Sequence, residues 1–306
     1  MKNIRLILTM AVLVAVLAMT SSCEKADLGD FTGKEAGEPN LVLRVVTTGN
    51  EAMTRADGSP FWTRLSFVVF QNGQKVKGVN QKEGDSGYGQ AEMALETGTY
   101  QVLVLAHSSD GNPTTTSAEK LQFTNAMGFT DTFYFYGTIS VTSQPKTHNI
   151  TLNRVTALLR FIINDDIPSN VTNLKFYYTG GSGALNATTG YGCVDSKQTV
   201  IHVLDRSAMT KPYSFDLYTI PKEPTAKLNL TVTAYDETQT AIYERVFKDI
   251  DVQVNKITEF SGDFFNTEPN PNVEEPHGDD DHNTSGNEIF LISANTEWAG
   301  VITKSY

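Results

Sequence analysis

Three groups of polar residues have the residue types of catalytic or metal-binding sites, but not their spacing. Cys193 and His202 could form a thiol–imidazole pair, yet Cys193 lies between apparent strands, with no helix N-terminus to activate its thiol. The run 180–183 lacks the G-x-S-x-G order of a nucleophile elbow. The acidic, His-containing segment 277–282 lacks the ligand spacing and the closing glutamate of a calcium loop. We therefore predict no catalytic residue, no metal site and no cofactor.

Cys23 lies at a position where the sequence predicts acylation of the thiol. An apolar run at 6–19 follows a short basic start and precedes small polar residues at 20–22. These are the three parts of a secretory signal, and the apolar run is too short to cross a bilayer. A cysteine at this point matches a bacterial lipobox, in which the thiol is acylated and the chain is cut before it. We predict a signal peptide at 1–22 and a lipid on Cys23; the alternative is an ordinary signal with an incidental cysteine.

The charge and the cysteine content narrow the classes of partner. The 306-residue chain has a formal net charge of −11, which becomes more negative once the basic residues of the signal leave. Binding to nucleic acid or to anionic lipid needs basic patches, so we expect neither. Only Cys23 and Cys193 are present. If Cys23 carries lipid, Cys193 has no disulfide partner, and packing must stabilise the exported chain.

Short alternating segments dominate the chain beyond residue 40. Residues 23–40 are polar and Gly-rich, which predicts a flexible tether between the lipid and the first fold. After them, β-branched and aromatic residues alternate with polar ones, and Gly, Asn, Asp and Ser separate the runs. The clearest alternation lies at 228–235, typical of a strand with one wet face. Asn-Gly at 72–73 predicts a tight hairpin after the run 65–70.

The fold class follows from these segments. Many short strands with turn signals, and no long amphipathic helix, indicate a sandwich or a barrel. The chain is longer than one ordinary domain and fits two. Asn153 and Arg154 interrupt two strand runs, so we predict an all-β protein with sandwiches at 41–154 and 155–265. The run that opens the second sandwich places five apolar side chains on one face: Val155, Ala157, Leu159, Phe161 and Ile163.

The end of the chain differs from the rest. Residues 266–287 are acidic and rich in Pro and Asn, which predicts a disordered linker. Residues 288–306 are apolar and strand-like again, and a lone strand cannot form a core. This tail must pair with a sheet of its own chain or with a sheet of a neighbour. If it is a donor strand, we expect Phe290, Ile292 and Trp298 to fill the pockets of the acceptor.

Four stretches of strand and turn residues are shared with one family: LSFVVFQNGQ (65–74), ETGTYQVLVLA (96–106), DTFYFYG (131–137), and LNRVTALLRFIINDDIP (152–168) with LKFYYTGGSGALNATTGYG (174–192). Through them, the chain from about 41 to 265 resembles the FimB-type fimbrial anchor or minor subunits of Bacteroidia. These are lipoproteins of the FimA-like superfamily, related to the pilins of type V pili. The lipoprotein signal fits as well, whereas the tail after 265 has no part in the likeness.

The resemblance implies two tandem transthyretin-like, Greek-key β-sandwiches in a surface-exposed lipoprotein of the outer membrane. Subunits of this group join by β-strand exchange, in which a donated strand completes the sheet of a neighbour. The implied partners are other fimbrial subunits, the outer membrane through the lipid, and a host or bacterial surface ligand. Polymerising pilins lose their lipid and first strand to an arginine-specific protease, whereas the FimB type keeps its lipid. Arg55, in a polar loop after the first strand, is where such a cut would fall.

Several functions stay open from the sequence. An anchor or accessory subunit keeps an acylated Cys23, whereas a stalk pilin matured by cleavage after Arg55 begins at Ala56. A surface lipoprotein that binds glycans would also be acidic, lipidated and β-rich. Aromatic side chains would stack on such sugars or, in the more common arrangement, pack across strands; these are Tyr134, Tyr136, Tyr177, Tyr178 and Tyr191. An enzyme ranks last because no catalytic signature is present.

Overall fold

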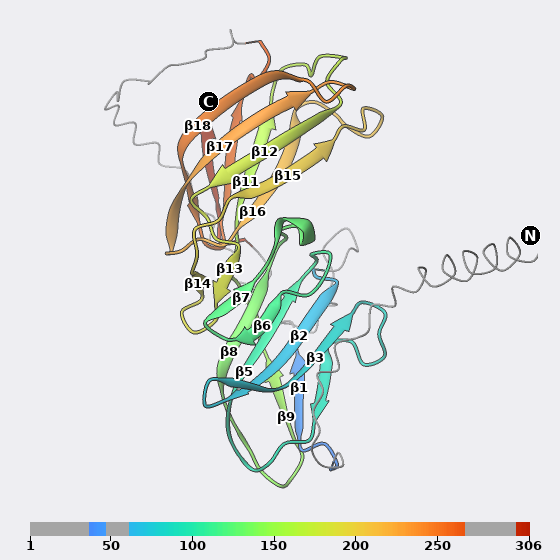
Figure 1. The fold of residues 1–306 in the computed structure, drawn as a ribbon, viewed down its shortest axis with the longest axis vertical. Helices are drawn as coiled ribbons and strands as arrows, with labels where there is room; N and C mark the ends of the chain where they lie inside the picture. Colours follow the sequence, from blue (N-terminus) through green and yellow to red (C-terminus); the bar gives the residue numbers. More distant parts are fainter. Residues whose placement is uncertain (1–36, 47–60, 267–297) are drawn as a thin grey trace, which may run out of the picture. The chain divides into compact units, whose positions relative to one another are not determined.

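The regular secondary structure of the described parts of the chain is almost wholly β-strand (Figure 1). The structure is a computed structural model and describes residues 37–46, 61–266 and 298–306. Within these ranges one short 3-10 turn, η1 (Asn125–Met127), interrupts the strands. No helix of the described residues is long and apolar enough to cross a membrane. The predicted all-β fold class is confirmed.

Two sheets pack face to face in the first sandwich, with the orders β4–β1–β9 and β10–β8–β5–β2–β3. Their strands are β1 (Leu41–Val45), β2 (Arg64–Gln71), β3 (Gln74–Lys82), β4 (Gln90–Met93), β5 (Gly98–His107), β8 (Phe133–Val141), β9 (Lys146–Ile150) and β10 (Asn153–Arg154). Alternate residues of both sheets, among them Leu43, Phe67 and Val104, are fully buried in one shared core. The alternation in the sequence thus separates an inner face from an outer face in each sheet.

The second sandwich has the sheet orders β16–β11–β19–β20 and β15–β12–β17–β18. Its strands are β11 (Ala157–Ile163), β12 (Asn173–Thr179), β15 (Gln198–Val203), β16 (Tyr213–Thr219), β17 (Thr225–Tyr235), β18 (Ala241–Gln253), β19 (Ile257–Gly262) and β20 (Val301–Ser305). The core between the sheets includes Phe161 and Phe176. It also holds the four alternating side chains of β17, as predicted: Leu228, Leu230, Val232 and Ala234.

The two sandwiches repeat one strand arrangement. β1 pairs parallel with β9 and antiparallel with β4, just as β11 pairs parallel with β19 and antiparallel with β16. β2 lies between β3 and β5, as β12 lies between β15 and β17. Strand β20 is an addition beyond β19 that has no equivalent beside β9 in the described residues. The terminal strand therefore extends a sheet that already has the full set of the first sandwich.

A fifth sheet, with the order β14–β13–β7–β6, joins short strands from both halves of the chain. They are β6 (Thr114–Ser117), β7 (Lys120–Gln122), β13 (Ala184–Asn186) and β14 (Tyr191–Gly192). A third core contains residues of this sheet and the outer faces of β2 and β5, including Leu121, Leu185 and Phe70. Val155 packs here and not with Ala157 and its neighbours. It precedes β11, so the alternation of that strand does not govern its side chain.

The predicted hairpin between β2 and β3 is confirmed. Asn72 and Gly73 form its two-residue turn, with φ angles of 52° and 78°. Both residue types tolerate this left-handed conformation, which matches the twist of the flanking strands. The turn returns the chain as β3, so that Gln74 lies opposite Gln71.

Candidate functional site

Most residues that the sequence singles out for function lie outside the described residues. These are Cys23, Arg55, Phe290 and Ile292, together with the segment 277–282. Their roles therefore stay predictions. The structure does describe the strands beside them: β1, which ends shortly before the segment with Arg55, and β20, which follows the segment with Phe290.

β1 occupies a slot between two other strands. Leu41 to Arg44 pair antiparallel with β4, and Leu41 to Val45 pair parallel with β9. The side chains of Leu41, Leu43 and Val45 are at most 6% exposed. Because β1 is paired along both edges and buries every second side chain, its removal would create two new sheet edges and a row of open pockets.

Both ends of β1 are fixed by hydrogen bonds. Asn40 Nδ2 donates to the carbonyl oxygens of Leu95 (2.9 Å) and Thr142 (2.8 Å). Asn40 Oδ1 accepts from the backbone N–H of Leu95 at 2.9 Å. At the other end, the N–H of Val46 donates to the carbonyl oxygen of Ile150 at 3.0 Å. Val46 is also the last described residue before the segment that contains Arg55.

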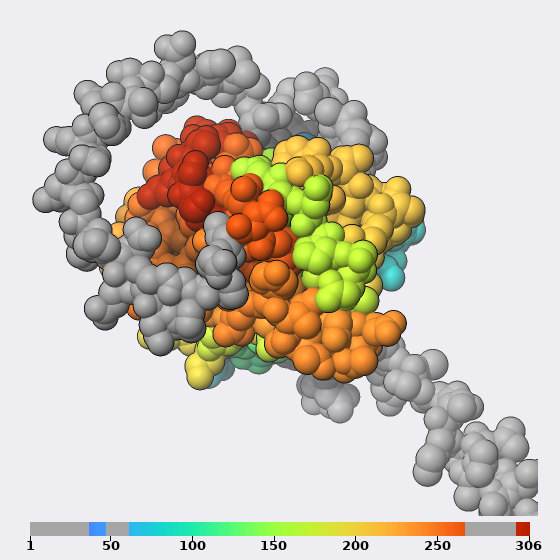
Figure 2. Space-filling model, turned by 90° about the horizontal axis from the view of Figure 1, so that it is seen from above, coloured from blue at the N-terminus to red at the C-terminus, as the bar shows by residue number. Residues whose placement is uncertain are grey.

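The C-terminal tail pairs with a sheet of its own chain. β20 lies parallel to β19 along its whole length. The N–H of Tyr306 donates to the carbonyl oxygen of Ser261 at 2.9 Å, and Lys304 forms an ion pair with Asp251. Figure 2 shows the last residues, in red, at the surface of the molecule. One of the two pairings that the sequence leaves open is therefore present, and donation to a neighbour stays a prediction.

Tyr306, the last residue, fills a pocket at the side of the second core. Three phenylalanine rings have centroids 4.8 to 4.9 Å from its own: Phe161, Phe247 and Phe260. Its hydroxyl donates to the carbonyl oxygen of Ile162 at 2.8 Å. Burial raises the pKa of this phenol, so the hydroxyl stays protonated and available as a donor. The tail thus adds to the core as well as to the sheet.

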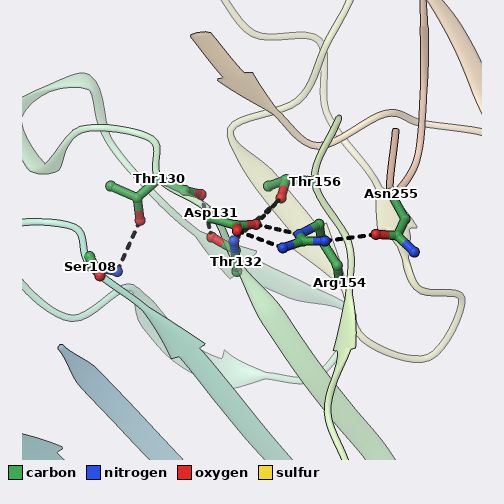
Figure 3. A network of polar contacts seen from close by, with 7 residues as sticks. All are labelled: Ser108, Thr130, Asp131, Thr132, Arg154, Thr156 and Asn255. Carbon is green, nitrogen blue, oxygen red and sulfur yellow. Dashed lines mark hydrogen bonds and ion pairs between the residues drawn. The ribbon is translucent and has the colours of Figure 1, made fainter. Parts of the chain in front are cut away.

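Arg154 lies at the centre of a buried polar network (Figure 3). Its Nε and Nη2 donate to the two carboxylate oxygens of Asp131 at 2.7 and 2.9 Å. Its Nη1 donates to Asn255 Oδ1 at 2.9 Å, and the Thr156 hydroxyl donates to Asp131 Oδ1 at 3.0 Å. Arg154 is 6% exposed and Asp131 is 4% exposed. Because Asp131 precedes β8 and Asn255 lies between β18 and β19, this network ties the first sandwich to the second.

Trp298 covers the network. The guanidinium of Arg154 lies 3.8 Å from the centroid of the Trp298 ring and 4.6 Å from that of Phe133. The ring of Tyr218 is stacked on Trp298 with centroids 6.4 Å apart. A cation that contacts aromatic faces gains about 0.5 to 2 kcal/mol from each, depending on its exposure. Trp298, predicted as a plug for a neighbour, here contacts residues of its own chain.

The remaining candidate groups are not arranged for chemistry. Burial raises the pKa of the Cys193 thiol, although Lys120 opposes this, so the thiol is not activated. His202 packs edge-on against Phe176, and no hydrogen bond joins it to Cys193 in this part of the structure. Among the described residues, no group of three or more His, Cys, Asp or Glu could hold a metal ion.

The tyrosines considered for sugar stacking are mostly packing residues. Tyr178 is fully buried, and its hydroxyl donates to the carbonyl oxygen of Tyr218 at 2.8 Å. Tyr134 and Tyr136 pack against the third core. These three side chains therefore stabilise the sheets and do not form a free aromatic surface.

The sequence did not predict that Arg154 and Asp131 form a buried ion pair or that Tyr306 packs against the second core. The sequence predicts only a break between two strand runs at Asn153 and Arg154, whereas the structure places these two residues in the short strand β10, paired with β8. A charged residue next to a buried strand is seldom buried without a partner. The one available signal was therefore a charge beside each of two apolar runs, Asp131 before 133–141 and Arg154 before 155–163.

Comparison with known proteins identifies a family. Residues 34–275 match the model of the fimbrillin-A associated anchor proteins Mfa1 and Mfa2. No curated protein matches the chain. A putative adhesin from Bacteroides ovatus is similar in structure, with 12% identity over 72% of this chain and 88% of that chain and a TM-score of 0.47. The fimbrial anchor protein Mfa2 from Porphyromonas gingivalis has 14% identity over 67% and 80%, with a TM-score of 0.40.

A fimbrial assembly protein from Parabacteroides distasonis has 14% identity over 70% of this chain and 85% of that chain, with a TM-score of 0.35. The family assignment depends on the family model alone, which spans both sandwiches except β20, and includes the segment between β1 and β2. That family consists of fimbrial proteins and is not an enzyme family. The chain therefore belongs to the family of fimbrillin-A associated anchor proteins Mfa1 and Mfa2 and is a fimbrial anchor or accessory subunit.

Proposed function

We propose that the chain is a lipoprotein of the outer membrane that anchors a fimbria and joins neighbouring subunits by β-strand exchange. In this proposal Cys23 carries the lipid, and residues 24–40 reach from the membrane to the first sandwich. Other fimbrial subunits bind at sheet edges through backbone hydrogen bonds, and their alternate side chains fill pockets. A host or bacterial surface ligand is a further partner of the assembled fibre.

The position of β1 carries this proposal. An anchor must keep its lipid and its first sandwich on one continuous chain. β1 is paired on both edges, with Leu41, Leu43 and Val45 buried, so it holds the preceding tether firmly. Cleavage after Arg55 would separate both Cys23 and β1 from the remaining fold. The same slot therefore distinguishes an anchor, in which it stays filled, from a polymerising stalk pilin, in which it is emptied.

Labelling with palmitate tests the anchoring role. The full-length chain, expressed in a Bacteroidia host, should incorporate the label and fractionate with the outer membrane. Cys23→Ser should abolish both results, whereas the matched control Cys193→Ser should change neither. An unlabelled wild-type chain, or equal labelling of the Cys23→Ser variant, would contradict the proposal.

The mature N-terminus separates the two fimbrial roles. Mass spectrometry of the protein from its membrane should find an acylated Cys23 as the first residue. A chain that starts at Ala56 would instead support the stalk pilin, and Arg55→Ala should then block its maturation. A mixture of both ends on one cell would assign both roles to different copies.

Incubation with a cognate pilin tests strand exchange. A strand-exchanged complex should resist SDS and should dissociate only on heating. Deletion of 288–306 asks which strand is donated: loss of the complex assigns donation to the tail, and its persistence assigns the joint to another edge. The absence of any SDS-resistant complex with the pilins of the same cell would remove strand exchange from the proposal.

A groove in the first sandwich supports a second candidate function, the binding of surface glycans. It has a volume of about 610 Å³, and its lining includes Arg44, Gln81, Tyr88, Gln90 and Glu92. Arg44 Nε and Nη2 donate to Gln90 Oε1 at 2.9 and 2.8 Å. Guanidinium, amide and carboxylate groups are the side chains that bind sugar hydroxyls.

A glycan array probed with the monomer tests this candidate. Arg44→Ala should weaken any binding at least tenfold, whereas Lys222→Ala, a charge removal outside the groove, should not. Binding that Arg44→Ala leaves unchanged would exclude the groove, and no binding to any glycan would exclude this function.

A further inference from the structure

Strand β15 ends its sheet with apolar side chains in solvent. It is bonded to β12 on one side, and no described strand lies on the other side (Figure 1). Ile201 is 60% exposed and Val203 is 81% exposed. Both lie on the outer face of the sheet, because Val200 and His202, which alternate with them along the strand, pack against the second core. An uncovered apolar edge of this kind is a template for another strand.

Two hydrogen bonds of the Asn125 side chain show which backbone groups of β15 point away from β12. Asn125 Oδ1 accepts from the N–H of Thr199 at 3.1 Å, and Asn125 Nδ2 donates to the carbonyl oxygen of Lys197 at 3.0 Å. Asn125 belongs to η1 and thus imitates a strand partner at the start of this edge. On the opposite side, the N–H of Leu204 donates to the carbonyl oxygen of Thr172, next to β12.

Backbone groups alternate in direction along a strand. Since those of Thr199 point outward and the N–H of Leu204 points toward β12, the N–H and C=O groups of Ile201 and Val203 point outward. These four groups have no hydrogen-bond partner among the described residues. Two residues of this edge, Ile201 and Val203, therefore have outward backbone groups free to pair with another strand. Asn125 occupies the edge next to them, on the side of Thr199.

β15 is also the exception among the sheet edges. Every other edge strand longer than four residues in the described part of the chain carries charged side chains, the usual protection against edge pairing. They are β3 (Lys75, Lys77, Lys82), β9 (Lys146), β16 (Asp216), β18 (Glu244, Arg245, Lys248, Asp249, Asp251) and β20 (Lys304). β15, with the sequence QTVIHV, has none. β3 holds the equivalent position in the first sandwich, so the two sandwiches differ in this protection.

We propose that β15 pairs antiparallel with β15 of a second copy of this chain, around a two-fold axis at His202. In this register Ile201 lies opposite Val203 of the partner subunit, and the four free groups of each copy are all used. A register shifted toward Thr199 would need the N–H that Asn125 already occupies. The exposed Ile201 and Val203 side chains would then cover one another across the joint, as apolar cross-strand pairs do.

The charges next to β15 favour a second copy over an unrelated strand. Lys197 precedes the strand and Asp205 follows it, and both are exposed. In the proposed register each strand leaves the edge after Val203, because Asn125 of the partner subunit already occupies the place beside Thr199. Asp205 of each copy then leaves toward the end of the joint at which Lys197 of the partner subunit lies, so each end carries charges of opposite sign by symmetry. No pair of like charges lies directly opposite. A two-fold pairing of β3, in contrast, would bring lysines together.

Sedimentation of the mature chain tests this proposal. The protein used is residues 23–306 with Cys23→Ser, so that neither lipid nor signal is present. It should form dimers in a concentration-dependent way. Ile201→Pro removes one outward N–H that the fold does not use, and Val203→Lys adds a charge; each should shift the dimer dissociation constant at least tenfold while the melting curve stays that of a folded sandwich. Val246→Lys, at a valine that is 58% exposed on β18, is the matched control and should leave the dimer intact.

Cross-linking tests the register. In a Cys23→Ser, Cys193→Ser background, Val203→Cys should be linked to its symmetry mate by a short bismaleimide, and Val246→Cys should not. A chain that stays monomeric up to about 1 mM, the effective concentration that tethering provides, would overturn the proposal. So would a dimer that survives both Ile201→Pro and Val203→Lys. A complex with a pilin that these two variants abolish, without any dimer of the chain itself, would assign the edge to a fimbrial partner and overturn it as well.

Discussion

The ring of Trp298 lies 3.8 Å from the guanidinium of Arg154, the same group that binds both carboxylate oxygens of Asp131. The segment that leads into β20 thus contacts Arg154, whose contacts with Asp131 and Asn255 tie the first sandwich to the second. Figure 3 shows these contacts of Arg154 with Asp131 and Asn255. A tail that leaves its own sheet must also give up this contact. Arg154 therefore takes part both in holding the tail and in joining the two sandwiches.

Trp298→Ala should loosen the terminal strand without unfolding the sandwich. The variant loses the contact with Arg154 and the stacking on Tyr218, together about 2 kcal/mol for partly buried groups. Hydrogen exchange of the β20 amides should accelerate about 10- to 30-fold, while β11 and β12 stay protected. Val301→Ala, which shortens a side chain that is 55% exposed on the same strand, is the control. Equal exchange rates in both variants would show that Trp298 does not hold the tail.

Asp131→Ala should be among the most damaging single changes in the chain. It leaves the guanidinium of Arg154 buried without its carboxylate, which typically costs about 3 to 5 kcal/mol. The free energy of unfolding in urea measures this loss. The exposed ion pair of Lys222 and Asp195 is the comparison, and Lys222→Ala should cost less than about 1 kcal/mol. If the two variants unfold at the same urea concentration, the Arg154 network contributes nothing to stability.

Much of the fold could be predicted because the sheets bury one face. Leu228, Leu230, Val232 and Ala234 recur with period two, and all four lie in the second core. β3 lacks such a pattern, since QKVKGVNQK is mainly exposed and rich in lysine. It is a strand because the Asn72–Gly73 turn returns the chain alongside β2, so a partner and not its own composition decides its structure.

No local pattern in the sequence predicts the fifth sheet or the buried network around Arg154. β7 and β13 are three residues each, and they pair across more than sixty positions of sequence. Arg154 finds Asp131 at a separation of 23 residues and Asn255 at 101. Such contacts depend on how distant segments meet, which a single sequence does not encode in its periodicity. The lipidation predicted at Cys23 is the opposite case, because that prediction depends only on a short contiguous motif.

The aromatic ring of Tyr306 should contribute more to the free energy of unfolding than its hydroxyl group does. Tyr306→Ala removes a partly buried aromatic ring that packs on Phe161, Phe247 and Phe260, at a cost of about 2 to 4 kcal/mol, below that of a fully buried ring. Tyr306→Phe loses only the hydrogen bond to Ile162, about 1 kcal/mol. Urea unfolding of the three proteins gives both values. If Tyr306→Phe is as unstable as Tyr306→Ala, the hydroxyl and not the packing holds the end of the chain.

His107 makes the stability of the first sandwich depend on pH. The residue is fully buried, its Nδ1 accepts from the N–H of Ser109 at 3.2 Å, and its ring is edge-on to Phe123. Burial, and secondly the charge of Arg64, lower the pKa of His107 from 6.5 to about 4. Between these two values the unfolded chain binds a proton that the folded chain does not. The stability from neutral His107 is therefore complete above pH 6.5 and is lost as the pH falls toward 4.

Replacing His107 with glutamine should remove most of this pH dependence. The difference between the two pKa values corresponds to about 3 kcal/mol, so the wild-type free energy of unfolding should fall by that order between pH 7 and pH 4 in excess of the fall in His107→Gln. Gln keeps an acceptor for the N–H of Ser109 but cannot take up a proton in this range. Burial also lowers the pKa values of His148 and His202, which act in the same direction, so a smaller slope should remain in the variant. Urea titrations at pH 4, 5, 6 and 7 measure the two slopes, and identical slopes would mean that His107 is not the buried group that responds to acid.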